Sequence, residues 1–157
     1  MSVSSAAPTQ DVSTLRVIDF DVDREDWSRY ELEDGNKVRA RLILVGLRGP
    51  RVPPQRGDPI VPESTLTVKV DAPLNRRGPK GIPTTPEEIA DPKKHGGVAV
   101  NVVNSSEPQN VYSIKGTAGK IRIKLVLNQI WRIDDRYDHL GDPVYVVNFS
   151  AVPYVEA

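Results

Sequence analysis

Two segments of this chain repeat one another, and the repeat limits what the chain can fold into. Residues 37–44 read KVRARLIL and residues 120–127 read KIRIKLVL, with four identical positions and three conservative replacements. Residues 30–32 (YEL) and 112–114 (YSI) precede them in the same order. In each copy the residue pattern is that of a strand, a tight turn and a longer strand, which predicts a β-hairpin. Duplication of one unit and convergence of two amphipathic strands with basic outer faces both explain this similarity.

Alternating apolar and polar residues predict a mainly β fold, a small antiparallel β-barrel or β-sandwich. Residues 34–36 (DGN) are a strong turn signal, because glycine adopts positive φ without strain. Residues 85–88 (TPEE) have the form of a helix start and predict one short helix. About seven strands are expected, over residues 15–22, 27–33, 37–47, 97–104, 111–115, 120–133 and 143–154.

Residues 49–97 differ in character from the rest of the chain. They contain ten of the fourteen prolines, and proline lacks the N–H group that the interior of a sheet requires. We therefore expect a long Pro-rich insertion, or arm, outside the sheet, with one short edge strand over residues 64–70. Residues 1–14 are expected to be a flexible N-terminal tail, and residues 15–157 a single β domain that the insertion interrupts.

The composition excludes several classes of protein. There is no cysteine, which excludes disulfides and thiolate metal sites. No apolar run approaches the roughly 20 residues needed to span a bilayer, and residues 1–14 lack the basic start and apolar run of a secretory signal. These features predict a soluble, cytoplasmic protein.

The net charge is zero, but it is unevenly distributed along the chain. Residues 1–35 carry nine acids and three bases, whereas residues 36–56 carry six bases and no acid. Adjacent blocks of opposite sign typically pair with each other, within one fold or between two copies.

Motifs that carry chemistry are scarce. The chain lacks the G-x-S-x-G elbow, the phosphate-binding loop and the dinucleotide fingerprint, so we expect no cofactor and no catalytic or metal-binding residues. The densest group of acid–base side chains is the loop over residues 134–142, which contains Asp134, Asp135, Asp138, His139 and Asp142. Such a loop is either a polar turn between two strands or the site of a small metal-dependent enzyme, and we favour the turn.

These observations favour a non-catalytic binding or assembly module that contacts partners through its tail and its arm. Because proline stiffens the arm, docking it costs less entropy than docking a Gly/Ser linker. The partner is expected to be another protein or a second copy of the chain, in a homo-oligomer. The candidate partner-binding residues are Arg48, Arg51, Val52, Arg56, Ile60, Val61, Arg76 and Arg77.

The basic outer positions of the two repeated strands leave nucleic-acid binding open as an alternative function. Its candidate residues are Arg39, Arg41, Arg122 and Lys124, since basic side chains neutralise phosphates. Single-strand binding also uses aromatic side chains as stacking platforms. Residues 49–97 contain no Phe, Tyr or Trp, which argues against nucleic-acid binding through the arm. The metal-dependent enzyme is the third alternative.

Overall fold

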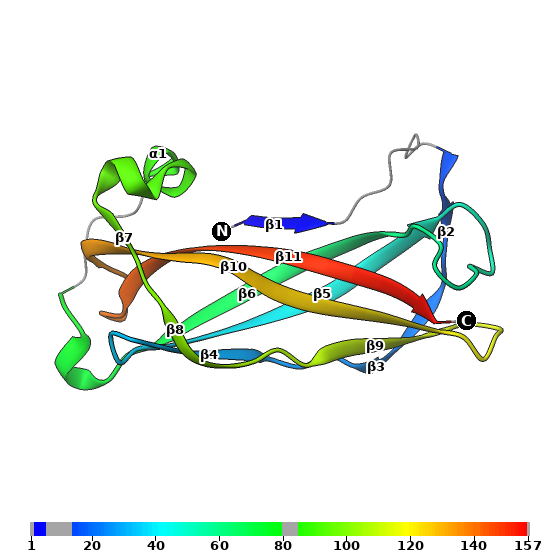
Figure 1. The fold of residues 1–157 in the computed structure, drawn as a ribbon, viewed down its shortest axis with the longest axis horizontal. Coiled ribbons are helices and arrows are strands. Elements are labelled where there is room, and N and C mark those ends of the chain that lie inside the picture. Colours follow the sequence, from blue (N-terminus) through cyan, green and yellow to red (C-terminus); the bar gives the residue numbers. More distant parts are fainter. Residues whose placement is uncertain (1, 6–13, 80–84, 157) are drawn as a thin grey trace.

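The computed structural model describes residues 2–5, 14–79 and 85–156, and these residues form eleven strands and one α-helix (Figure 1). The helix is α1 (Pro86–Ala90), and two 3-10 helices, η2 (Leu74–Arg76) and η3 (Pro92–His95), flank it. The strands are β1 (Ser2–Ser5), β2 (Arg16–Val17), β3 (Phe20–Arg24), β4 (Ser28–Leu32), β5 (Lys37–Gly49), β6 (Val61–Asp71), β7 (Gly97–Ala99), β8 (Val102–Ser106), β9 (Gln109–Ile114), β10 (Lys120–Tyr137) and β11 (Pro143–Glu156).

The strands assemble into two sheets. Sheet A has the order β1-β11-β10-β9-β3, with β7 also paired to β10. Sheet B has the order β2-β5-β4-β8, with β6 also paired to β5. The mainly β prediction is therefore confirmed, but the expected number of about seven strands is not. The predicted helix is confirmed as α1, in which the Thr85 hydroxyl accepts the N–H of Glu88 at 3.3 Å.

A single core lies between the two sheets. Alternate residues of β5 and β10 point inward, as the two-residue period of a strand requires. The largest fully buried side chains are Tyr112 and Phe149. The inward-facing residues of the two long strands include Val38, Ala40, Leu42, Leu44, Ile121, Ile123 and Leu125. Because both sheets contribute to one core, the outer faces of β5 and β10 point away from each other.

Part of the expected arm belongs to a sheet. Residues 61–71 form β6, which pairs with β5 along its whole length, and Ile60 just before it is 1% exposed. The strand is thus longer than the predicted residues 64–70, and this stretch of the arm does not lie outside the fold. The structure tolerates Pro62 here because β6 pairs with β5 on one side and the proline stands near the start of the strand.

The expected tail also contributes to a sheet. Residues 2–5 form β1, which pairs in parallel with β11. The remainder of the tail over residues 6–13 lies outside the described residues, and so do residues 80–84 of the expected arm.

The repeat extends beyond the two hairpins. β2 to β6 form a first unit and β7 to β11 form a second unit, with strands of matching order and register. Both hairpins close with the same 3.0 Å backbone bond, from Leu32 N–H to the Asn36 carbonyl and from Ile114 N–H to the Gly119 carbonyl. In both long strands the register shifts just after equivalent residues, Leu44 and Leu127. The two units are therefore related by an approximate two-fold symmetry.

The two units also exchange a strand with each other. β3 of the first unit pairs with β9 of the second, and β8 of the second unit pairs with β4 of the first. Two equivalent backbone hydrogen bonds, both 3.0 Å long, also link the two units. One runs from Glu33 N–H to the Asn101 carbonyl and the other from Lys115 N–H to the Asp19 carbonyl. The end pairs of the two exchanged strands are equivalent, although the bulge falls at a different position in each. Convergence of two isolated hairpins does not account for such a reciprocal exchange, so the structure favours duplication.

Candidate functional site

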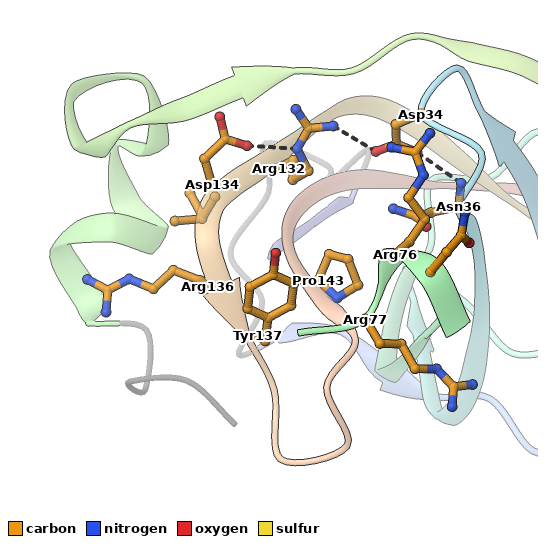
Figure 2. Close-up of a pocket in the computed structure, with 11 residues that line it drawn as sticks. Asp34, Asn36, Arg76, Arg77, Arg132, Asp134, Arg136, Tyr137 and Pro143 are labelled. Atoms are coloured by element: carbon orange, nitrogen blue, oxygen red, sulfur yellow. Dashed lines mark hydrogen bonds and ion pairs between the residues drawn. The ribbon is translucent and has the colours of Figure 1, made fainter. Parts of the chain in front are cut away.

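A cavity of about 430 Å³ opens where the β4–β5 turn, the segment after β6 and the far end of β10 come together (Figure 2). We call it the end cavity. Its volume lies within the range of small-molecule sites, about 300–1,000 Å³. Most of its lining is charged or carries an amide: Asp34, Asn36, Asn75, Arg76, Arg77, Arg132, Asp134 and Arg136, with Ile133, Tyr137 and Pro143.

The lining of the end cavity has an excess of positive charge. It contains four guanidinium groups and two carboxylates. Guanidinium groups are rigid, forked donors that match the geometry of phosphate and carboxylate groups. Because arginine keeps its proton at every relevant pH, these residues are suited to binding an anion rather than to transferring protons.

A buried hydrogen-bonded network holds the wall of the end cavity. The Tyr145 hydroxyl donates to the Asp34 carboxylate, and the Asn36 side-chain amide donates to the Tyr145 hydroxyl at 2.6 Å. Arg132 Nη1 lies 3.0 Å from the same Asp34 carboxylate. The Asn36 Oδ1 atom is buried and has no donor among the described residues. This unsatisfied acceptor belongs to a residue that lines the cavity.

The charges in this network hold Asp34 in its ionised form. Burial opposes ionisation of Asp34, but hydrogen bonds from Tyr145, the backbone of Asn36 and Arg132 outweigh it, so the pKa of Asp34 lies below its usual value. The hydrogen bond to Asp134, together with Asp34, raises the pKa of Arg132. Burial raises the pKa of Tyr145, and the hydrogen bond to Asp34 raises it further. The wall therefore stays charged and hydrogen-bonded around neutral pH.

Two of the four arginines are fixed by carboxylates. Arg132 Nε donates to Asp134 at 2.8 Å in addition to its bond with Asp34. Arg136 lies 3.3 Å from Glu88 of α1. In Figure 2 these two arginines extend from β10, and Arg76 and Arg77 extend from the segment after β6. The cavity is thus lined by guanidinium groups from two separate elements.

The other two arginines are less constrained. Arg77 Nε donates to the Ala72 carbonyl at 3.2 Å and lies 3.7 Å from Asp142. Arg76 is exposed, and its guanidinium group forms no hydrogen bond or ion pair with any part of the chain that the structure describes, although its backbone N–H donates to the Pro73 carbonyl at 2.8 Å. Its guanidinium group is therefore available to a ligand without first breaking a contact within the protein.

Close packing holds the segment that carries Arg76 and Arg77. Gly78 donates its N–H to the Gly141 carbonyl at 2.9 Å. A Cβ atom on Gly78 would lie 2.5 Å from the ring of Tyr137, which lines the cavity. Only glycine lets the backbone approach this ring so closely, so the segment is held against β10.

The opposite end of the molecule provides an internal comparison for the network. Arg132 and Tyr145 are partners across β10 and β11, and their equivalents in the first unit are Gly49 and Ile60. Ile60 packs against Gly49 there, since its Cγ2 atom lies 3.4 Å from where a Cβ of Gly49 would be. The first unit thus has an apolar contact between Gly49 and Ile60 at the positions where the end cavity has the polar residues Arg132 and Tyr145.

The hairpin turns differ in the same way. The Asp34 carboxylate accepts the N–H of Asn36 at 3.0 Å. In the second hairpin the Thr117 hydroxyl accepts the N–H of Gly119 at the same distance, and residues 115–119 (KGTAG) contain no carboxylate. Because the described residues at the equivalent positions of the other end make no such charged contacts, the network of Asp34, Arg132 and Tyr145 is not a requirement of the fold.

The structure divides the predicted partner-binding residues between the two ends. Arg76 and Arg77 line the end cavity. Three arginines lie near the opposite end and have partners: Arg48 with Glu63 at 2.7 Å, Arg51 with Asp58 at 3.0 Å, and Arg56 with the Tyr154 hydroxyl at 3.0 Å.

The three apolar candidates differ in exposure. Val52 is 49% exposed, and Val61 begins β6 and is half-buried. Ile60 is 1% exposed and belongs to the core. Its assignment to a partner-binding surface was therefore wrong, because its side chain fills the space over Gly49.

The residues predicted for nucleic-acid binding lie on two sheets. Arg39 and Arg41 belong to β5 in sheet B, and Arg122 and Lys124 belong to β10 in sheet A. Their side chains are on the outer faces, which point away from each other, so the four do not form one surface. Arg39 stacks on Trp27, with its Cζ atom 4.8 Å from the ring centroid.

The acidic segment over residues 134–142 is only partly a loop. β10 extends to Tyr137, and Asp138 closes the turn by accepting the N–H groups of Leu140 and Asp142 at 2.8 and 3.0 Å. Asp142 is buried and lies 3.2 Å from Lys69. His139 is exposed. In the described part of the chain, no three acidic or histidine side chains are grouped so as to hold a metal ion.

Sequence reasoning missed most of the end cavity. Asp34 and Asn36 were interpreted as turn residues, and Arg132, Arg136 and Tyr145 were not singled out. A position-by-position comparison of the two repeats contains a signal for two of them, because Arg132 and Tyr145 stand where the first unit has Gly49 and Ile60.

No protein-family model, curated protein or solved structure matches this chain. Among the described residues, no helix has the length and apolar character needed to cross a bilayer.

Proposed function

We propose that this protein is a non-catalytic binding module whose end cavity takes an anionic group, a phosphate or a carboxylate, of its ligand. One observation carries the proposal: four arginines surround a cavity at one end of an approximately symmetric fold, and the equivalent end has an apolar contact instead. Residues that a fold does not need, and that cost free energy to bury, are candidates for function.

The four arginines divide into two roles. Arg132 and Arg136 are held by Asp34, Asp134 and Glu88, so they form a fixed wall in which carboxylates already neutralise the guanidinium groups. Arg76 and Arg77 are the groups that donate to the anion, since their guanidinium groups are exposed and held by few contacts. Fixed charges cost little reorganisation when the ligand binds, which favours affinity.

Calorimetric titration with phosphate, pyrophosphate and citrate tests the proposal. We expect saturable binding of at least one of these anions, and an affinity at least tenfold lower in the double variant Arg76→Gln/Arg77→Gln. A hydrogen bond to a charged group contributes about 1.5–3 kcal/mol, and each 1.4 kcal/mol is about tenfold in affinity.

The matched control is Arg51→Gln/Arg56→Gln, which removes two arginines at the opposite end. It should retain the affinity of the unmodified protein to within about twofold. Absence of saturable binding by all three anions contradicts the proposal. So does an equal loss of affinity in the two double variants, because that result reports net charge rather than a site.

A further inference from the structure

Three basic side chains stand in a row across the outer face of sheet B. Arg29 of β4 is directly opposite Arg39 of β5, and Arg39 is directly opposite Lys69 of β6. We call these three residues the basic row. Neighbouring strands are about 4.8 Å apart, and like charges directly opposite each other destabilise a sheet. The row therefore costs stability unless something neutralises it.

The protein neutralises the basic row only in part. Asp71 lies 3.3 Å from Arg39 and 3.7 Å from Lys69. Arg29 is exposed and has no acidic partner in the described part of the chain. The remaining positive charge faces solvent and is available to an acidic ligand.

The second unit does not repeat the row. The equivalent positions on the outer face of sheet A are Val111, Arg122 and Tyr154, which are partners across β9, β10 and β11. Arg122 is the one cation among them, and it pairs with Glu156 at 2.6 Å. The same positions thus form a stable sheet without three cations, so the fold does not require the basic row.

The basic row leads toward the end cavity. Lys69 Nζ lies 3.2 Å from one oxygen of the buried Asp142, and Arg77 Nε lies 3.7 Å from the other. Arg77 also lines the end cavity. Asp142 therefore bridges Lys69 of the basic row and Arg77 of the end cavity, and this carboxylate places the two basic sites side by side.

We infer that the ligand is an acidic peptide segment of a protein partner, which binds with one anionic group in the end cavity and further acidic side chains on the basic row. This inference rests on the proposed function and adds the class of partner. Clusters of arginine are a recurring device for recognising acidic and phosphorylated peptides. Single-stranded nucleic acid would also need stacking platforms, and the Trp27 ring beside the row is already covered by Arg39.

The test measures binding of a fluorescein-labelled ten-residue peptide of alternating Glu and Ser that carries phosphoserine at one end. A second peptide has Gln in place of Glu and keeps the phosphoserine. A ten-nucleotide oligothymidylate of comparable charge is the third probe. The variants are Arg29→Gln/Arg39→Gln and the matched control Arg122→Gln, which removes the equivalent of Arg39 and its ion pair from sheet A.

We expect the Glu peptide to bind at least tenfold more tightly than the Gln peptide. Arg29→Gln/Arg39→Gln should remove that advantage, and Arg122→Gln should leave it unchanged within about twofold. Pyrophosphate affinity should stay the same in both variants, since neither touches the end cavity. Thermal melting of each variant establishes that it is folded.

Each of the other outcomes contradicts either this inference or the proposed function. If pyrophosphate binds but the Glu peptide has no advantage over the Gln peptide, this inference fails and the proposed function stands. If the Glu peptide binds through the row but no probe responds to Arg76→Gln/Arg77→Gln, the proposed function fails. If the oligothymidylate binds more tightly than the Glu peptide and loses affinity in Arg29→Gln/Arg39→Gln, the partner is a nucleic acid and the inference is overturned.

Discussion

Glu25 and Glu107 occupy equivalent places in the two units, and each carboxylate links its own unit to the other. Glu25 Oε2 accepts the N–H of Leu44 and the hydroxyl of Tyr112, both at 2.8 Å. Glu107 Oε2 accepts the N–H of Leu127 at 2.9 Å and the hydroxyl of Tyr30 at 2.7 Å. The two carboxylates thus satisfy backbone groups at the point where each long strand shifts its register.

Removing either tyrosine hydroxyl should weaken the fold by a similar amount. Tyr30 and Tyr112 are buried, so Tyr30→Phe and Tyr112→Phe each leave a carboxylate short of one donor. We expect each variant to lower the free energy of unfolding by about 1–3 kcal/mol, measured by urea denaturation. Tyr154→Phe, at a position that is 44% exposed, is the control and should change it by less than about 0.5 kcal/mol. A buried variant as stable as this control would show that the link does not bear on stability.

The wall of the end cavity should make stability depend on pH in the acid range. Hydrogen bonds outweigh burial and lower the pKa of Asp34 in the folded state. Its contribution is therefore fully present above the ordinary carboxyl pKa of about 3.9, and is lost as the pH falls through the lower folded-state value. Urea midpoints should show Asp34→Asn clearly less stable than the unmodified protein at neutral pH, with the gap closing below about pH 4. A gap that stays constant or widens on acidification would contradict this assignment.

Ile60 and Val52 lie in the same connection between β5 and β6 but should respond differently to truncation. Ile60 is 1% exposed and packs over Gly49, whereas Val52 is 49% exposed. We expect Ile60→Ala to cost about 2–5 kcal/mol, because it leaves a cavity in the core. Val52→Ala should cost less than about 0.5 kcal/mol. Equal midpoints for the two variants in a denaturant titration would place Ile60 outside the core.

The strands that alternate strictly could be predicted from the sequence, and β6 could not be predicted in full. The alternation in β5 and β10 is local, and it fixes which residues face the core. Proline was taken to exclude all of residues 49–97 from the sheet except an edge strand over residues 64–70. The observed strand β6 begins earlier, at Val61, because it pairs with β5 on one side only, so the missing N–H of Pro62 is tolerated near its start. Whether a strand is central or at an edge depends on tertiary pairing, which the local pattern does not contain.

The end cavity was harder to predict than the fold for a related reason. Asp34 lies 98 residues from Arg132 and 111 residues from Tyr145 in the sequence, and each of the three is an ordinary residue among its own neighbours. The strand pairing of β10 with β11 and the position of the β4–β5 turn bring them together. The one sequence signal was the difference between the repeats, and its meaning required knowing that the two units are equivalent in space.

Titration of ¹⁵N-labelled protein with pyrophosphate, followed through backbone amide chemical shifts, shows directly whether the end cavity binds an anion. We expect saturable shifts at Asn36, at residues 75–77 and at residues 132–137, which surround the end cavity, with little change at residues 50–60 at the opposite end. Shifts confined to residues 50–60, or no saturable shift near the end cavity at millimolar pyrophosphate, would contradict it.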